Sequence, residues 1–452
     1  MRVLIIGGGG REHALAWKLR QDDPDLDIVA APGNPGIAEL ADCVSIAATD
    51  LPALERLARE LDVDLTIVGP EAPLALGIVD RFRAAGLPIF GPTRAAAEIE
   101  TSKAFAKQLM LDAGIPTARA EMHTEPAAAK GAARAFGAPV VIKASGLAAG
   151  KGVIVCATLP EAERAIDDML EGNMFGDAGH EVLVEEFMEG EEISIFAITD
   201  GDAFVVLPGL QDHKRLLDGD LGPNTGGMGA YLPVSLMPPA ADLAGASLHG
   251  ARDAVLPGAL MEVPVRAQIL APVLAALAAA GRPFSGLLYA GLMVTRDAIK
   301  VVEFNCRFGD PETEALLPAL GIPLLPLLMA SASGGLEGHA GEECHVLPRA
   351  CVTTVLAAAN YPNTPRTGDV ISIPPVPDDV IVFHAGTARN AAGELVTAGG
   401  RVLAISATAP TVAEASARSL AFAESVQFDG KQLRTDIGWR EVARSADSND
   451  NS

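Results

Sequence analysis

Over the first hundred residues, short apolar runs alternate with stretches in which apolar residues recur every three or four positions. The runs are typical of strands buried on both faces, and the longer stretches have the period of amphipathic helices. Strands that alternate with helices predict a parallel sheet with right-handed crossovers, in a first domain that ends near residue 100. The expected strands are Val3–Ile6, Ile28–Ala31, Leu65–Val68 and Ile89–Pro92, and the expected helices are Glu12–Arg20 and Leu51–Leu61.

After Ser102 the pattern changes to one helix, Lys103–Ala113, followed by many strands. Leu287–Val294 and Ile299–Phe304 flank a short polar turn and predict a hairpin. Further strands are expected at Val140–Lys143, Val153–Val155, Leu183–Phe187 and Ile193–Ile198, then a β-rich unit over residues 345–440 with strands Cys351–Leu356, Val380–His384 and Val402–Ala407 and the helix Val412–Ser425. The polar residues at the end of the chain, 441–452, are expected to be a disordered tail.

The composition is that of a packed protein of several domains, because 49% of the 452 residues are hydrophobic and 20% are charged. The net charge of −24 argues against a nucleic-acid or anionic-membrane surface. Cations that bind small phosphorylated substrates must therefore be clustered. The five cysteines lack CxxC spacing, so they indicate neither a zinc site nor a disulfide framework. No signal-peptide pattern or twenty-residue apolar span is evident, and we expect a cytoplasmic protein.

The first glycine-rich segment, residues 7–10, follows a strand and opens a helix. A dinucleotide fingerprint would need glycine where Glu12 stands, and an acidic residue about twenty positions later that is missing here. A nicotinamide site is therefore disfavoured. A loop that binds phosphate through free N–H groups at the helix N-terminus is still open, and so is a plain turn.

The second glycine-rich segment runs from Lys143 to Gly152 and joins two strands. It is not a Walker A loop, because only three residues separate Gly146 from Gly150 and Gly152 stands where Ser or Thr would bind magnesium. A flexible flap with a lysine at its tip can fold over a triphosphate. Lys151 would then meet the outer phosphates and Lys143 the inner ones.

Alternation along the strand that ends near residue 305 places Glu303, Asn305 and Arg307 on one side and Phe304 and Cys306 on the other. A carboxylate and an amide oxygen two residues apart can bind a hard cation such as Mg²⁺. Arg307 is placed to bind a carboxylate or the phosphate being transferred. Cys306 could be a nucleophile, but its direction favours a small core residue.

Two further polar stretches have uncertain roles. The acidic residues 185–192 are either a solvated edge or a hinge whose backbone binds adenine. The long polar, glycine-rich stretch over residues 211–230 is typical of a functional loop. In it, His213, Lys214 and Arg215 supply a cation cluster that we interpret as phosphate or carboxylate donors, with His213 as a possible general base.

The segments beginning at Lys143, Gln211, Gly222 and Glu303 closely resemble the phosphoribosylamine–glycine ligase family, whose members are ATP-grasp enzymes of purine biosynthesis. The resemblance covers about residues 1–440. It implies an N-terminal doubly wound domain over residues 1–101, an ATP-grasp domain over 102–330 with a small mobile lid at 120–190, and a β-rich α+β C-terminal domain over 331–440. It also implies an enzyme that joins glycine to 5-phosphoribosylamine at the expense of ATP, through glycyl phosphate. We expect a monomer, with a dimer left open.

The resemblance further implies roles for individual residues. ATP is expected at Lys103, Lys143, Gly150, Lys151, Gly152, Glu185, Phe187, Met188 and Glu192, and Mg²⁺ or Mn²⁺ at Glu303 and Asn305. The other substrates are expected at Gly8, Gly9, Gly10, Gly69, Pro70, Glu71, Asp212, His213, Lys214, Arg215, Asn224, Thr225, Gly226, Gly227 and Arg307. Arg307, Lys143 and Lys151 are the expected catalytic residues.

The sequence departs from the family pattern in two notable places. Met237–Arg266 reads as a surface insertion, and Glu314 stands where the family pattern has glutamine. Two other functions compete with the glycine ligase. One is an ATP-grasp ligase for a different carboxylate, and the other is a nucleotide-binding regulatory module without turnover.

Overall fold

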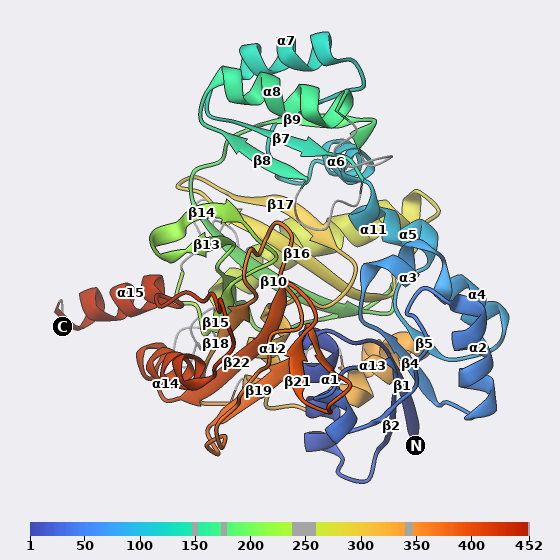
Figure 1. The fold of residues 1–452 in the computed structure, drawn as a ribbon. Coiled ribbons are helices and arrows are strands. Elements are labelled where there is room, and N and C mark those ends of the chain that lie inside the picture. The colour runs from blue at the N-terminus through green and yellow to red at the C-terminus, as the bar shows by residue number, and fades with distance from the viewer. Residues whose placement is uncertain (147–151, 173–178, 237–258, 340–346, 451–452) are drawn as a thin grey trace.

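The computed structural model describes residues 1–146, 152–172, 179–236, 259–339 and 347–450 (Figure 1). Its N-terminal unit is a parallel sheet in the order β3-β2-β1-β4-β5, which confirms the predicted parallel sheet. The strand order reverses between β1 and β4, so their carboxyl ends frame a crevice. The strands are β1 Arg2–Gly7, β2 Asp27–Pro32, β3 Asp42–Cys43, β4 Leu65–Val68 and β5 Ile89–Phe90, and the helices are α1 Gly10–Asp22, η1 Ile37–Glu39, α2 Leu51–Glu60, α3 Glu71–Ala75, α4 Ile78–Ala84 and α5 Arg94–Thr101.

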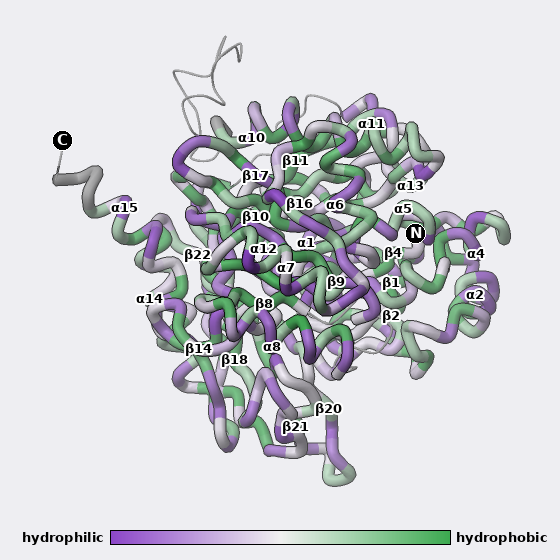
Figure 2. The backbone as a smooth tube through the Cα atoms, turned by 90° about the horizontal axis from the view of Figure 1, so that it is seen from above, coloured by the Kyte–Doolittle hydropathy of each residue, from purple (hydrophilic) through white to green (hydrophobic). Residues whose placement is uncertain are grey.

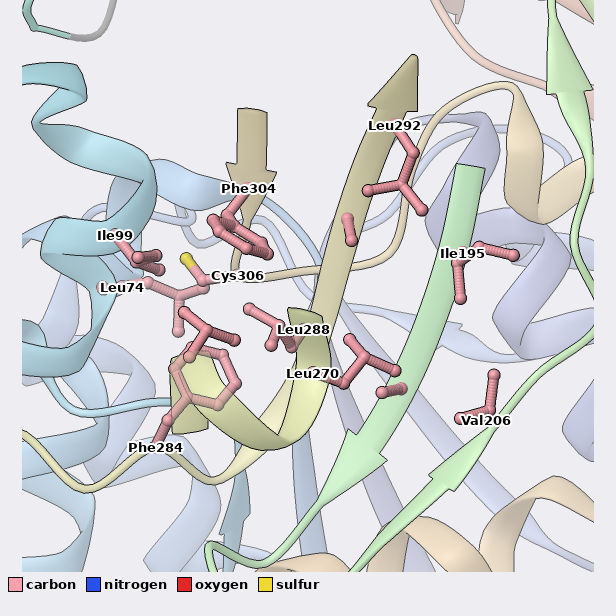
Figure 3. Packing of buried hydrophobic residues seen from close by; sticks show 14 of the residues in the cluster. Leu74, Ile99, Ile195, Val206, Leu270, Phe284, Leu288, Leu292, Phe304 and Cys306 are labelled. Carbon is pink, nitrogen blue, oxygen red and sulfur yellow. The ribbon is translucent and has the colours of Figure 1, made fainter. Parts of the chain in front are cut away.

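A second, antiparallel sheet in the order β11-β10-β16-β17 forms the centre of the molecule. The predicted hairpin is confirmed as β16 (Gly286–Val294) and β17 (Ile299–Asn305). β10 spans Glu191–Thr199 and β11 spans Phe204–Val206, and helix α6 (Lys103–Asp112) also contacts β17. Figure 3 shows Leu288, Leu292 and Phe304 of this sheet packed with Ile99 and Leu270 in one apolar cluster.

The prediction of a surface insertion over Met237–Arg266 is wrong for its last residues. Ala259–Val265 form helix α10, which continues through a π-helical turn (Arg266–Leu270) into α11 (Ala271–Ala279). The run Met261–Ala279 is long and apolar enough to cross a membrane, but Met261, Val265 and Ile269 are buried in the protein core. It is therefore the core helix behind the central sheet.

The lid is a separate layer above the central sheet (Figure 1). Its antiparallel sheet has the order β6-β9-β7-β8, and its buried apolar residues form their own cluster. The elements are β6 Ala120–His123, α7 Pro126–Phe136, β7 Val140–Ala144, β8 Val153–Cys156, α8 Leu159–Leu170 and β9 Val182–Glu186.

The C-terminal sheet is shared between two regions of the chain. Its order is β12-β15-β18-β22-β19, and the first two strands, Gln211–Asp212 and Gly229–Leu232, precede the central hairpin in sequence. The C-terminal unit therefore completes a sheet begun by the polar stretch 211–230. The other elements are β13 Arg215–Leu217, η3 Asp218–Asp220, β14 Leu221–Asn224, α12 Glu312–Ala319, α13 Leu324–Ser333, η5 Leu336–His339, β18 Ala350–Ala357, β19 Val380–His384, β20 Thr387–Arg389, β21 Leu395–Thr397, β22 Arg401–Ala409 and α14 Val412–Ser425.

The prediction of a disordered tail is also wrong up to residue 450. Helix α15 (Trp439–Asp450) continues from the C-terminal unit and projects away from the molecule (Figures 1 and 2). Glu441 accepts a hydrogen bond from the Ser235 backbone, and Arg444 pairs with Glu191 at 2.9 Å. These contacts with residues more than two hundred positions away stabilise its first turns.

We predict that Met261→Ala lowers the free energy of unfolding by about 2–5 kcal/mol, because it removes a fully buried side chain from the core. Urea denaturation measures the change, with Leu111→Ala on the exposed side of α6 as a control expected within about 0.5 kcal/mol of the parent. Equal effects of the two substitutions would contradict a core position for α10.

Candidate active site

The end of β17 separates polar from apolar side chains as the alternation predicted. Phe304 and Cys306 are 2% and 1% exposed and point into the apolar cluster (Figure 3), while Glu303 and Asn305 are only partly buried on the opposite side. The Cys306 thiol donates a hydrogen bond to Glu100 Oε2 at 3.1 Å. Burial and then the Glu100 carboxylate raise the pKa of this thiol, so Cys306 is a core residue and not a nucleophile.

Glu303 lies within a group of lysines drawn from α6, β7 and the link between β12 and β13. Burial alone would raise the pKa of Glu303, but Lys214, Lys143 and Lys103 outweigh it and lower the pKa. The ionised carboxylate and the Asn305 amide are the hard oxygen donors that Mg²⁺ prefers. Among the described residues no three His, Cys, Asp or Glu side chains form a metal cage. A cation here would thus take its other ligands from phosphates and water, as Mg²⁺ commonly does.

Glu185 lies between two lysines at the junction of the lid with the rest of the protein. Lys143 of the lid lies 2.8 Å from Glu185 Oε2, and Lys107 of α6 lies 3.1 Å from Glu185 Oε1. Lys143 also donates to the Val302 carbonyl of β17 at 3.2 Å. The Glu185 carboxylate is therefore already engaged by two lysines.

Lys107 is a residue that the sequence analysis missed. It lies one turn after Lys103 and is almost fully buried. It also donates to Thr117 Oγ1 at 2.7 Å and the Ala118 carbonyl at 3.1 Å. The sequence pattern that could have identified Lys107 is its position on the otherwise apolar side of an amphipathic helix.

Asp212 and Lys214 form a second polar group beside Glu303. Lys214 makes an ion pair with Glu192, and Glu192, Asp212 and Glu303 raise the pKa of Lys214 although burial would lower it. Burial first, and then Glu312 and Glu192, raise the pKa of Asp212 to about 7 against the opposing effect of Lys214. This group is thus continuous with the expected metal ligands.

The expected cation cluster is divided. The His213 ring is buried, with its Nε2 accepting the Gly438 N–H at 3.0 Å and its Nδ1 3.6 Å from Asp220. Arg215 donates to the Gly222 carbonyl at 2.6 Å within the β13–β14 hairpin, where it pairs with Asn224. Successive residues of an extended chain point to opposite sides, so Lys214 faces Glu303 while His213 packs against the C-terminal unit.

The segment Thr225–Gly227 joins the central and C-terminal units. The Gly226 N–H donates to Tyr361 Oη at 2.8 Å, and the Gly226 carbonyl accepts from Arg401. Gly227 has φ +114°, and a Cβ there would collide with Pro311. Arg401, which the sequence analysis did not identify, also donates to the Asp310 carbonyl at 2.6 Å and pairs with its carboxylate at 3.1 Å.

Gly8, Gly9 and Gly10 lie with Gly69, Pro70 and Glu71 at the carboxyl edge of the N-terminal sheet. The side chain of Glu12 folds back beneath this edge, and its Oε2 accepts the Gly9 N–H at 2.5 Å. A Cβ on Gly7 would lie 2.6 Å from Glu12 Cδ, so these glycines make room for the carboxylate. Phosphate binding by the Gly9 N–H is therefore replaced by an internal carboxylate.

Arg307 connects this edge to β17. Its guanidinium lies 3.1 Å from Glu100 and 3.6 Å from Glu71. Burial would raise the pKa of Glu71, but Arg307 and Arg11 lower it.

Of the expected flap residues, Gly150 and Lys151 lie outside the described residues, whereas the Gly152 carbonyl accepts the Ala144 N–H at 2.8 Å. Phe187 is exposed and Met188 partly exposed in the link between β9 and β10.

Two antiparallel sheets, one a lid with its own core, that meet at buried lysines beside an acidic strand end have the architecture of an ATP-grasp protein. Models of the phosphoribosylglycinamide synthetase family match the chain in three parts: the N domain over residues 1–100, the ATP-grasp (A) domain over 101–247 and 251–313, and the C domain over 351–440. The chain belongs to this family.

Individual relatives agree with the family match over nearly the whole length. The chain is 49% identical to phosphoribosylamine–glycine ligase of Xanthomonas axonopodis pv. citri, covering 98% of this chain and 99% of that one. The crystal structure of the Thermotoga maritima phosphoribosylamine–glycine ligase is 32% identical, with a TM-score of 0.79 over 96% of this chain and all of that one. The biotin carboxylase domain of Hydrogenobacter thermophilus 2-oxoglutarate carboxylase, solved with MgADP and bicarbonate, is 17% identical. Its TM-score of 0.69, over 96% of this chain and 91% of that one, shows a shared fold alone.

We predict that Lys107→Met destabilises the protein by about 3–5 kcal/mol, because it leaves the buried Glu185 carboxylate with one cation fewer. The matched control is Lys130→Met, which removes a lysine from a more exposed pair with Asp167 and is expected to change stability by at most about 1 kcal/mol. Urea denaturation of both variants measures the difference. If the two variants have the same free energy of unfolding, the buried ion pair between Lys107 and Glu185 does not stabilise the protein.

Proposed function

We propose that the chain joins glycine to 5-phosphoribosylamine with ATP, giving glycinamide ribonucleotide, ADP and phosphate in purine biosynthesis. The single observation that carries the proposal is the polar side of β17, where Glu303 is surrounded by lysines at the junction with the lid. Relatives that match over nearly the full length bear the name phosphoribosylamine–glycine ligase, which supports this choice of substrates.

ATP lies between the lid and the central sheet in this proposal. Lys103 and Lys143, with the flap residues Gly150, Lys151 and Gly152, bind the phosphates. The backbone at Glu185, Phe187 and Met188 holds the nucleoside, with Glu192 at its edge. The Lys103 ammonium donates to the Gly146 carbonyl at 3.2 Å, and this contact supports its position beside the flap.

ATP-grasp enzymes use ATP with a divalent metal, and Glu303 and Asn305 are our proposed ligands for Mg²⁺ or Mn²⁺. A cation held there would supply charge neutralisation for the transferred phosphate. Phosphoryl transfer requires positioning and charge neutralisation more than a protein nucleophile. Lys143 and Lys151 hold the phosphate, and Arg307 holds the glycine carboxylate in line with it. The amine of phosphoribosylamine, bound at the carboxyl edge of the N-terminal sheet and near residues 212–227, then displaces phosphate from glycyl phosphate.

The remaining expectations are also proposals. The enzyme works as a monomer in the cytoplasm, on small molecules and without nucleic acid or membrane. An ATP-grasp ligase for another carboxylate is the alternative function, since low-identity structures share the fold. A regulatory module without turnover is disfavoured, because Glu303, Asn305 and Lys143 are all present.

We predict that the purified chain releases phosphate from ATP only when glycine and phosphoribosylamine are both present, because the amine must displace phosphate from the acyl phosphate. Phosphate release is followed with each substrate omitted in turn, and with formate or bicarbonate in place of glycine. Phosphate release that does not depend on glycine would show that the proposed function is wrong.

We predict that Glu303→Ala lowers kcat/KM at least about 100-fold, because the variant loses the carboxylate that binds the cation neutralising the transferred phosphate. Circular dichroism should be unchanged. Glu60→Ala, at an exposed carboxylate of α2, is the control and should retain full activity. An active Glu303→Ala enzyme would place the metal elsewhere.

A further inference from the structure

Glu314 is a buried acid without a hydrogen-bond donor. It is fully buried in the first turn of α12, and neither carboxylate oxygen accepts a hydrogen bond from an N–H or O–H group in the described part of the chain. An ionised carboxylate can only accept hydrogen bonds, so this position would leave a buried charge unsatisfied. A protonated Glu314 instead has an O–H group to donate.

Asp310 is the acceptor within reach. Burial would raise the pKa of Asp310, but Arg401, Arg11 and Arg307 lower it, and a hydrogen bond donated by a protonated Glu314 would act in the same direction. Burial first, and then the Asp310 charge, raise the pKa of Glu314 well above its usual range. Two neighbouring carboxyl groups in a buried site share one proton, because both cannot be ionised together. The protonated oxygen of Glu314 then has Asp310 as its acceptor, and the other oxygen is a neutral carbonyl, which costs less to leave without a donor than a charged carboxylate.

The charged groups around Glu314 come from three elements. Asp310 precedes its own helix, Arg11 lies on α1 and Arg401 on β22. Glu12 and His13, the other titratable residues in the first turn of α1, are bonded to the Gly9 and His384 backbones respectively. Strands β15 and β18, which also pack against α12, contain no charged residue. After burial, Asp310 is therefore the main group that raises the pKa of Glu314.

Asp310 lies near residues of both expected substrate positions. Its side chain is 17% exposed, whereas Glu314 below it is fully buried. Asp310 Oδ2 would lie 3.7 Å from a Cβ on Gly9, and Glu314 Oε1 would collide with a Cβ on Gly10. Arg307, on the glycine side, is among the cations that lower the pKa of Asp310. Asp310 therefore lies between the N-terminal sheet edge and the residue expected to hold glycine.

We propose that Asp310 accepts a hydrogen bond from the amino group of phosphoribosylamine, and that Glu314 is a positioning residue that donates its proton to Asp310. This inference rests on the proposed function. Arg401 holds one Asp310 oxygen at 3.1 Å, and the Glu314 hydroxyl fixes the rotation of the carboxylate. The amine is then presented with its lone pair free to attack the acyl carbon.

Two variants separate this role from simple packing. Glu314→Gln keeps a donor at every pH, and Glu314→Leu has similar size without a donor. Near neutral pH, Glu314→Gln should keep a KM for phosphoribosylamine within about twofold of the parent. Glu314→Leu should raise that KM about tenfold, with the KM values for ATP and glycine within about twofold, as expected for loss of one hydrogen bond to a charged group. If Glu314→Gln raises the KM as much as Glu314→Leu, the proposal is wrong.

Protein stability provides a readout independent of turnover. The pKa of Glu314 is higher in the folded protein than in the unfolded one. At a pH between these two values, the folded state keeps the Glu314 proton and the unfolded state has lost it. The parent therefore loses stability as pH rises from the unfolded pKa toward the folded one, and Glu314→Gln does not. Urea denaturation between pH 4.5 and 8 should show the advantage of Glu314→Gln growing with pH, and a constant difference would overturn proton sharing. If the parent lacks glycine-dependent turnover, the proposed function fails while this measurement still tests the pair.

Discussion

Lysine side chains can lie close together in a protein interior only when carboxylates lie among them, because an uncompensated buried charge is strongly destabilising. Here burial lowers the pKa of Lys103 and Lys107, yet Lys103 lies near Glu303 and Glu185, and Lys107 forms an ion pair with Glu185. These contacts also connect the parts of the molecule, since the lid, helix α6 and strand β17 meet at them. Although the chain has a net charge of −24, the lysines that are expected to bind phosphate are thus clustered at this junction.

The elements predicted well were those whose pattern is local. Four strands of the N-terminal sheet and the β16–β17 hairpin were predicted to within a residue or two, because run length and alternation are properties of adjacent residues. The two-residue edge strand β3 was not predicted. Helix α15 and the start of α10 were missed, because their partners lie far away in sequence. The shared C-terminal sheet could not be predicted either, since β12 has two residues and its pairing depends on distant strands.

The same distinction applies to the site. Alternation correctly placed Glu303 and Asn305 together, opposite Phe304. It was not applied to the run Asp212–Arg215, where it would have separated His213 from Lys214. Lys107 and Arg401 were missed because each acts through partners that only the fold brings near. Asp310 was missed because the sequence did not show that Glu314, in the same segment, is fully buried. Roles for individual substrate ligands stay predictions.

The shared sheet also has a consequence for biosynthesis. Strand β15 leaves the ribosome long before β18 and β22, so one edge of it has no partner until most of the remaining chain has been made. At about 5–20 residues per second, Gly226 waits roughly ten to thirty seconds for Arg401. During that interval the nascent protein carries an open strand edge and an incomplete glycine loop, a state prone to association with other chains. A cell that makes this enzyme is thus expected to protect its late-folding half with chaperones, and translation speed would influence its yield.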